Sequence, residues 1–147
     1  MNDDDSTPAP ACCDSAVACV FAKALFARAA QCELSRRRAI ADREVIECPS
    51  PSARMNCQTL AQLARERARF VLKLRDGTPV MHAQALRLQC GGLQGLQQAL
   101  GAPKAGVHHL VGLALQRHGS LTDLPWDTIV QALASWRPRG PHRPLAP

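Results

Sequence analysis

The sequence predicts an all-α protein, and its composition carries that prediction. Hydrophobic residues make up 46% of the 147 residues, but there is no Tyr, with only three Phe and two Trp. A core of Leu, Ala and Val with many Arg and Gln between them favours helices, because straight side chains lose little rotamer freedom there, whereas strands favour β-branched and aromatic residues. The length suits one domain with its own core. We therefore expect a single compact domain over residues 15–136, with about five to six helices.

The two ends of the chain differ from this body in composition. Residues 1–14 combine four Asp with proline and small residues and contain no base, which predicts a disordered acidic tail. Residues 137–147 are rich in Pro and Arg and predict a disordered basic tail. Beyond residue 14 the chain holds 18 basic and 8 acidic residues, a net charge of +10. This excess suits an acidic partner, in the first place an acidic redox protein and in the second a nucleic acid.

The first half of the body predicts three helices. Ser15 is a suitable N-cap for a helix that runs to about residue 31, and Ser35 for a second over residues 35–46. The run Cys48-Pro49-Ser50-Pro51 then stops helical propagation, because each proline lacks an N–H and restrains the residue before it. A third helix, capped by Ser50 or Ser52, should continue to about Leu74.

The second half is punctuated by glycine and proline. After a turn at residues 75–79, a helix over residues 81–90 should end at Gly91-Gly92. A short helix over residues 93–100 is broken at Gly101, and another covers residues 105–117. The last predicted helix follows Ser120, and its packing face consists of Trp126, Ile129, Val130, Leu133 and Trp136.

Four of the seven cysteines form the candidate site. We assign as ligands of one centre Cys32, Cys48, Cys57 and Cys90. Each lies at the edge of a predicted helix, where a rigid element can aim a ligand and still let it meet the others. Cys19 falls inside the first predicted helix, where a cysteine usually behaves as a small hydrophobe, and it is the first substitute for one of the four. Cys12 and Cys13 lie in the acidic tail and are interpreted as incidental thiols.

An iron–sulfur cluster of the [4Fe–4S] type fits this spacing better than zinc. Structural zinc sites tend to offer close ligand pairs separated by roughly two to four residues, and these four cysteines contain no such pair. Iron–sulfur clusters take ligands from scattered positions, and proline directly after a ligating cysteine, as in Cys48-Pro49, also occurs in ferredoxin motifs. Gly91-Gly92 after Cys90 would let backbone N–H groups approach sulfurs. Zinc, or no metal, is the alternative.

The functional prediction is electron transfer or redox sensing in the cytoplasm. No stretch has the length of a membrane span, and the apolar segment after residue 15 lacks the basic start of a secretory signal, so the thiols should stay reduced. The sequence offers no Ser/His/Asp set, no Cys/His pair with a base and no paired carboxylates, so an enzyme is not expected. The alternative function is a basic helical adaptor or nucleic-acid-binding module, metal-free or zinc-stabilised.

Overall fold

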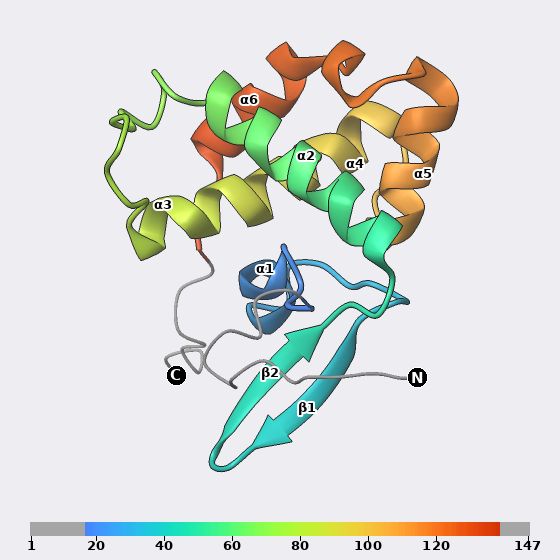
Figure 1. Ribbon diagram of the computed structural model, residues 1–147. Helices are drawn as coiled ribbons and strands as arrows, with labels where there is room; N and C mark the ends of the chain where they lie inside the picture. Colours follow the sequence, from blue (N-terminus) through green and yellow to red (C-terminus); the bar gives the residue numbers. More distant parts are fainter. Residues whose placement is uncertain (1–16, 139–147) are drawn as a thin grey trace, which may run out of the picture.

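A layer of helices and one projecting hairpin make up the computed structural model, which describes residues 17–138 (Figure 1). The predicted tail at residues 1–14, and all but Arg137 and Pro138 of the tail at residues 137–147, lie outside the described residues. In chain order the elements are α1 (Ala22–Phe26), β1 (Arg36–Ile40), β2 (Arg43–Glu47), α2 (Pro51–Arg67), α3 (His82–Leu86), the π-helical turn η3 (Arg87–Gly91), α4 (Gly92–Leu100), α5 (Val107–His118), the 3-10 turn η4 (Leu121–Asp123) and α6 (Trp126–Ser135).

The hairpin corrects the all-α prediction. Residues 35–46, expected to be a helix, instead form most of an antiparallel pair in which Arg36 lies opposite Glu47 and Ile40 opposite Arg43. Val45 and Ile46 are β-branched and pack well on a pleated surface, which helps to explain the strand. The reversal needs only two residues, and Ala41 enters it with φ 57°. The protein is therefore mostly helical, with one small two-stranded sheet.

The first helix is shorter than predicted because the residues before it take part in strand pairing. Ala18 pairs with Glu47 as an isolated β-bridge, and the Cys19 N–H donates to the Ile46 carbonyl at 3.0 Å. Residues 17–19 are thus extended along β2, and α1 covers only Ala22–Phe26. Arg28, with φ 59°, turns the chain away after this helix. The predicted limits of residues 15 and 31 were wrong.

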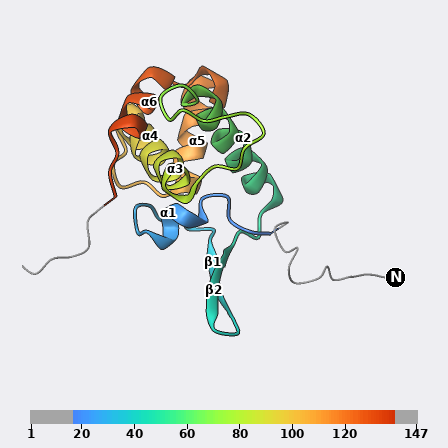
Figure 2. The same cartoon turned by 90° about the vertical axis from the view of Figure 1, so that its left-hand side faces the viewer.

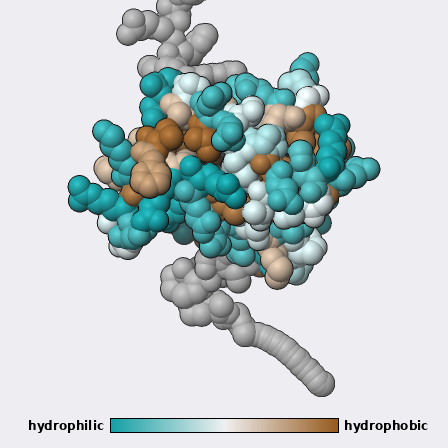
Figure 3. All heavy atoms as spheres, turned by 90° about the horizontal axis from the view of Figure 1, so that it is seen from above, coloured by the Kyte–Doolittle hydropathy of each residue, from teal (hydrophilic) through white to brown (hydrophobic). Residues whose placement is uncertain are grey.

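The N-terminus of α2 confirms the predicted cap. The Ser50 hydroxyl accepts a hydrogen bond from the Ala53 N–H at 3.2 Å, and Pro51 occupies the first helical position, where its missing N–H costs nothing. The helix ends at Arg67 instead of continuing to Leu74, and turns follow it. The ring of Phe70 in these turns is 91% exposed. Seen from above, the helical layer shows separate apolar areas among hydrophilic side chains (Figure 3).

The helical rod from α3 through η3 to α4 overturns a second expectation. Gly91 and Gly92 keep right-handed helical dihedral angles instead of ending a helix, and the chain turns only at Gly101, with φ 66°. The glycines serve close packing. A Cβ atom on Gly91 would lie 2.8 Å from the Leu133 Cα atom, so only glycine allows the backbone of α6 to cross the rod this closely. The predicted break at Gly91-Gly92 was therefore wrong, and the one at Gly101 is confirmed.

The core lies where α4 meets α6, α2 and α5. The predicted packing face of the last helix is confirmed for Trp126, Ile129 and Leu133, which are buried. The largest fully buried side chains are Leu93, Leu96, Leu110, Ile129, Leu133 and Cys90. Each such aliphatic side chain stabilises the fold by about 1.5–3 kcal/mol relative to exposure. In the part of the chain that the structure describes, no charged side chain is buried, and no helix has the length and apolar character that crossing a bilayer requires.

Candidate functional site

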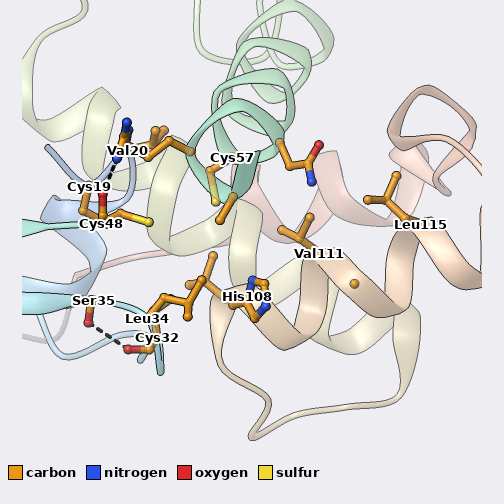
Figure 4. Close-up of a pocket in the computed structure, with 15 residues that line it drawn as sticks. Cys19, Val20, Cys32, Leu34, Ser35, Cys48, Cys57, His108, Val111 and Leu115 are labelled. Carbon is orange, nitrogen blue, oxygen red and sulfur yellow. Dashed lines mark hydrogen bonds between the residues drawn. The ribbon is translucent and has the colours of Figure 1, made fainter. Parts of the chain in front are cut away.

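Four cysteines from separate segments line one cavity of about 80 Å³ (Figure 4). They are Cys19, Cys32, Cys48 and Cys57. Cys48 is buried and the other three are half-buried. The cavity lies where the root of the hairpin meets α2 and the first three turns of α5. Three of the four cysteines assigned from the sequence therefore meet at one place, together with the substitute Cys19.

Backbone pairing fixes two of these cysteines beside each other. The Cys19 N–H donates to the Ile46 carbonyl at 3.0 Å, and the Cys48 N–H donates to the Val17 carbonyl at 2.8 Å. The segment before α1 and the end of β2 are thus held together at Cys19 and Cys48. The Cys48 thiol lies 3.7 Å from the Ser50 carbonyl oxygen, so the turn that caps α2 also orients this side chain.

The other two cysteines come from α2 and from the loop before the hairpin. Cys57 follows the Ser50 cap by two helical turns and faces the cavity from α2 (Figure 4). The Cys32 carbonyl accepts hydrogen bonds from the Ser35 hydroxyl at 2.8 Å and the Ser35 N–H at 3.2 Å. The adjacent Gln31 carbonyl accepts from the Val107 N–H at 2.7 Å, which ties this loop to the start of α5. Each thiol is therefore placed by a local backbone constraint.

The thiols influence one another electrostatically. Burial raises the pKa of Cys57 to about 12, and the neighbouring Cys19, Cys32 and Cys48 add to the shift. Burial also raises the pKa of Cys19, with further increases from Cys32 and Cys48, against a backbone hydrogen bond at Phe21 that lowers it. Removing a proton here places a thiolate among other sulfurs in a partly apolar site, which is unfavourable unless a cation compensates.

Apart from the thiols, the walls are mostly apolar, with four polar side chains. Val20, Leu34, Val111 and Leu115 are among the apolar residues, and the polar ones are Ser35, Arg54, Asn56 and His108. Arg54 donates a hydrogen bond to the Cys48 carbonyl, which holds a guanidinium at the site. His108 lies in the first turn of α5 and is exposed. The site thus combines sulfur donors with one fixed positive charge.

Cys90 lies elsewhere. Its side chain is 1% exposed, sits in the hydrophobic core within η3, and has its pKa raised by burial alone, with no contribution from another cysteine. It borders a separate cavity that also involves Leu86, Gln94 and Trp136. The structure therefore does not bring Cys90 to the pocket of the other three assigned cysteines. Cys19 takes that place, and the sequence signal for it is the β-branched flank Val17 and Val20, which favours an extended segment over a buried helix.

The donor set of the cavity consists of four thiols. Within residues 17–138, no group of three or more His, Cys, Asp or Glu side chains is arranged to hold one metal ion. The four thiols surround a volume well above the roughly 10–15 Å³ that one water molecule needs by the same measure. Thiolates are the ligands of iron–sulfur clusters, whose irons are spread over a cage. The residues present are compatible with such a group in both number and chemistry.

Comparisons with known protein families, with curated proteins and with solved structures find no match for this chain.

Proposed function

We propose that this protein binds an iron–sulfur cluster of the [4Fe–4S] type through Cys19, Cys32, Cys48 and Cys57, and uses it for electron transfer or redox sensing. The observation that carries the proposal is that four cysteines from four separate segments line one cavity. Unrelated buried thiols would be expected at separate places in a helical core, as Cys90 is. When bound, such a cluster accepts and releases single electrons.

The chain's own residues would hold the centre and set its charge. Four thiolates place several negative charges in one site, and the Arg54 guanidinium beside Cys48 offsets part of that charge. A positive charge near the site favours the reduced state, because reduction adds one more electron to it. Val111 and Leu115 limit the access of water to the sulfurs, which strengthens the effect of each nearby charge.

Metal binding would also connect the segments of the site. The four cysteines belong to the segment before α1, the loop before β1, the residue after β2, and α2. Ligands that must lose protons and converge from separate segments make metal affinity part of folding stability. Loss of the centre would therefore loosen the root of the hairpin, which is a structural basis for sensing.

The first test compares cysteines in two different places, the half-buried Cys19 of the pocket and the buried Cys90 of the core. Cys19→Ala removes a thiol from the pocket, and Cys90→Ala removes one from the core. After anaerobic purification, the parent protein should show near-equal iron and sulfide approaching about four of each per chain, with the matching visible absorption. Cys19→Ala should lose most of the iron, and Cys90→Ala should retain it.

Three results would contradict the proposal. Equal iron in both variants would show that the pocket thiols are not ligands, and loss only in Cys90→Ala would return the assignment to the predicted set of Cys32, Cys48, Cys57 and Cys90. A colourless parent protein that holds zinc or no metal would favour the alternative of a basic helical adaptor or nucleic-acid-binding module. That outcome would be followed by measuring the salt dependence of binding to DNA and RNA.

A further inference from the structure

The hairpin projects from the helical body as an arm, defined as residues 36–47 (Figures 1 and 2). Each strand has five residues, about 17 Å of extended chain at 3.4 Å per residue. Most of the arm is exposed, and the body holds it at the root, where Ile46 is 3% exposed. A lone two-stranded hairpin is marginally stable in water, so an arm of this kind depends on its attachment.

One face of the arm is used inside the molecule. Successive residues of a strand point to opposite faces, so Arg37, Ala39, Glu44 and Ile46 share one side. Arg37 lies 5.3 Å from the centre of the Phe26 ring, donates to the Leu25 carbonyl at 3.3 Å and pairs with Glu44 at 3.1 Å. These contacts fasten this inner face to α1.

The opposite face, here called the outer face, presents three arginines around an apolar pair. By register its rows are Arg36 opposite Glu47, Arg38 opposite Val45 and Ile40 opposite Arg43. Ile40 and Val45 are therefore diagonal neighbours in the two rows nearest the turn. Arg38 and Arg43 flank them, and Arg36 lies one row further from the turn. Arg38 pairs with Glu47 at 2.8 Å, whereas Arg36 and Arg43 form no ion pair with any residue that the structure describes. The outer face carries a net charge of about +2.

This arrangement suits a protein surface better than a nucleic acid. Protein interfaces are enriched in Arg, and they commonly combine a small apolar contact with a polar rim. The arm has little net positive charge with which to bind a phosphate backbone, because Asp42, Glu44 and Glu47 nearly offset its four arginines. A partner with carboxylates around an apolar side chain would satisfy both parts of the outer face.

The arm is also joined to the cysteine pocket at its root. Cys32 lies four residues before β1, Cys48 follows β2 directly, and the Cys19 N–H bonds to Ile46 within β2. Three of the four pocket cysteines are thus at the attachment of the arm. A centre held by these three thiols would therefore add constraints at the attachment of the arm.

We propose that the outer face docks an acidic protein partner, whose carboxylates meet Arg36, Arg38 and Arg43 around Ile40 and Val45. Docking requires an ordered arm and hence a loaded cysteine site; this second part rests on the proposed function, whereas the docking surface rests on the arm alone. The arm then reports the state of the centre to the partner.

The experiment uses a photo-crosslinking residue, p-benzoylphenylalanine, in cells that naturally produce the chain. It replaces Ile40 on the outer face or, as the control, exposed Thr59 on α2. We expect an adduct with a protein of acidic net charge from position 40 only, and at least about tenfold less of it when Arg36→Glu and Arg43→Glu are added. The purified arginine variant should keep the iron and sulfide content of the parent protein.

Other results overturn the docking surface. These are an adduct with nucleic acid, an adduct of equal yield in the arginine variant, or no adduct from position 40. Anaerobic iron depletion tests the second part separately. An unchanged adduct yield without iron would refute the coupling to the site, and the iron assay on the parent protein shows independently whether the cluster proposal holds.

Discussion

Replacing Gly95 by alanine tests the close crossing of α4 and α6. A Cβ atom at this position would lie 2.9 Å from the Ile129 Cα atom and 3.0 Å from both the Ile129 carbonyl oxygen and the Ala132 Cβ atom. Carbon atoms in favourable contact are about 3.5–4.0 Å apart, so the helices must separate by about 0.5–1 Å. Two of the three atoms belong to the α6 backbone, so rotation of a side chain cannot relieve the contact.

The magnitude follows from two opposing effects. Forcing an extra carbon into a packed core costs about 1–3 kcal/mol, and alanine recovers up to about 1 kcal/mol through its higher helix propensity. With the full recovery, the net loss in free energy of unfolding should reach about 2 kcal/mol at most. For a domain of about 120 residues, 1 kcal/mol corresponds to about 4 °C in Tm, so Gly95→Ala should lower Tm by up to about 8 °C.

Gly112 on α5 provides a control of opposite sign. Apart from the adjoining backbone of its own helix, no atom lies within 4 Å of the position that its Cβ would take, so Gly112→Ala brings the helix-propensity gain without a clash. It should raise the free energy of unfolding by about 0.5–1 kcal/mol and Tm by about 2–4 °C. Thermal unfolding followed by circular dichroism measures both. A stabilising Gly95→Ala, or equal shifts in the two variants, would refute the close crossing of α4 and α6.

Three further predictions concern the pocket and the arm. In metal-free protein, the raised pKa of Cys57 means that its contribution to stability is present below pH 9.0 and is lost as the pH rises toward about 12. Urea unfolding across this range should therefore be less pH-dependent in Cys57→Ala, and an identical slope would contradict the burial of this thiol. In the iron-loaded protein, Arg54→Gln should lower the midpoint potential and Arg54→Lys should largely preserve it, as measured by redox titration; equal potentials in all three proteins would exclude a charge effect. Ala41→Gly relieves a left-handed conformation with φ 57° and should slow amide hydrogen exchange in the arm, stabilising it by about 1 kcal/mol, whereas Ala39→Gly within β1 should speed exchange.

Elements with local signals could be predicted from the sequence. The Ser50 cap with Pro51, the helix over α5 and the apolar face of α6 each depend on residues within a few positions of one another. The hairpin could not be predicted in this way. Its arginines are compatible with either a helix or a strand, and the decision depends on pairing with residues 17–19, which lie far away in the chain.

The role of a glycine pair in the helical rod also could not be predicted from the neighbouring sequence. Gly91-Gly92 has the composition of a helix end, and the sequence gives no sign that α6 crosses there. Only the contact with Leu133 distinguishes a packing glycine from a terminating one. A glycine next to a possible helix end is therefore ambiguous until its spatial neighbours are known.

The candidate site depended partly on local sequence signals and partly on contacts between distant residues. Cys32, Cys48 and Cys57 could be selected because they flank predicted elements, and all three line the pocket. Cys19 and Cys90 exchanged roles for a structural reason. The predicted long helix would have buried Cys19, whereas strand pairing exposes it to the pocket, and the unbroken helical rod carries Cys90 into the core.

The position of the hairpin between Cys32 and Cys48 has an evolutionary consequence. Its ends are fixed at the pocket, but its tip lies in solvent, so one residue can be added to or removed from each strand without moving either thiol. The interval between these two cysteines can therefore change by even numbers of residues while the pocket is conserved. Related proteins can then differ in cysteine spacing, and a fixed-interval motif would fail to group them, although their thiols occupy equivalent positions in space.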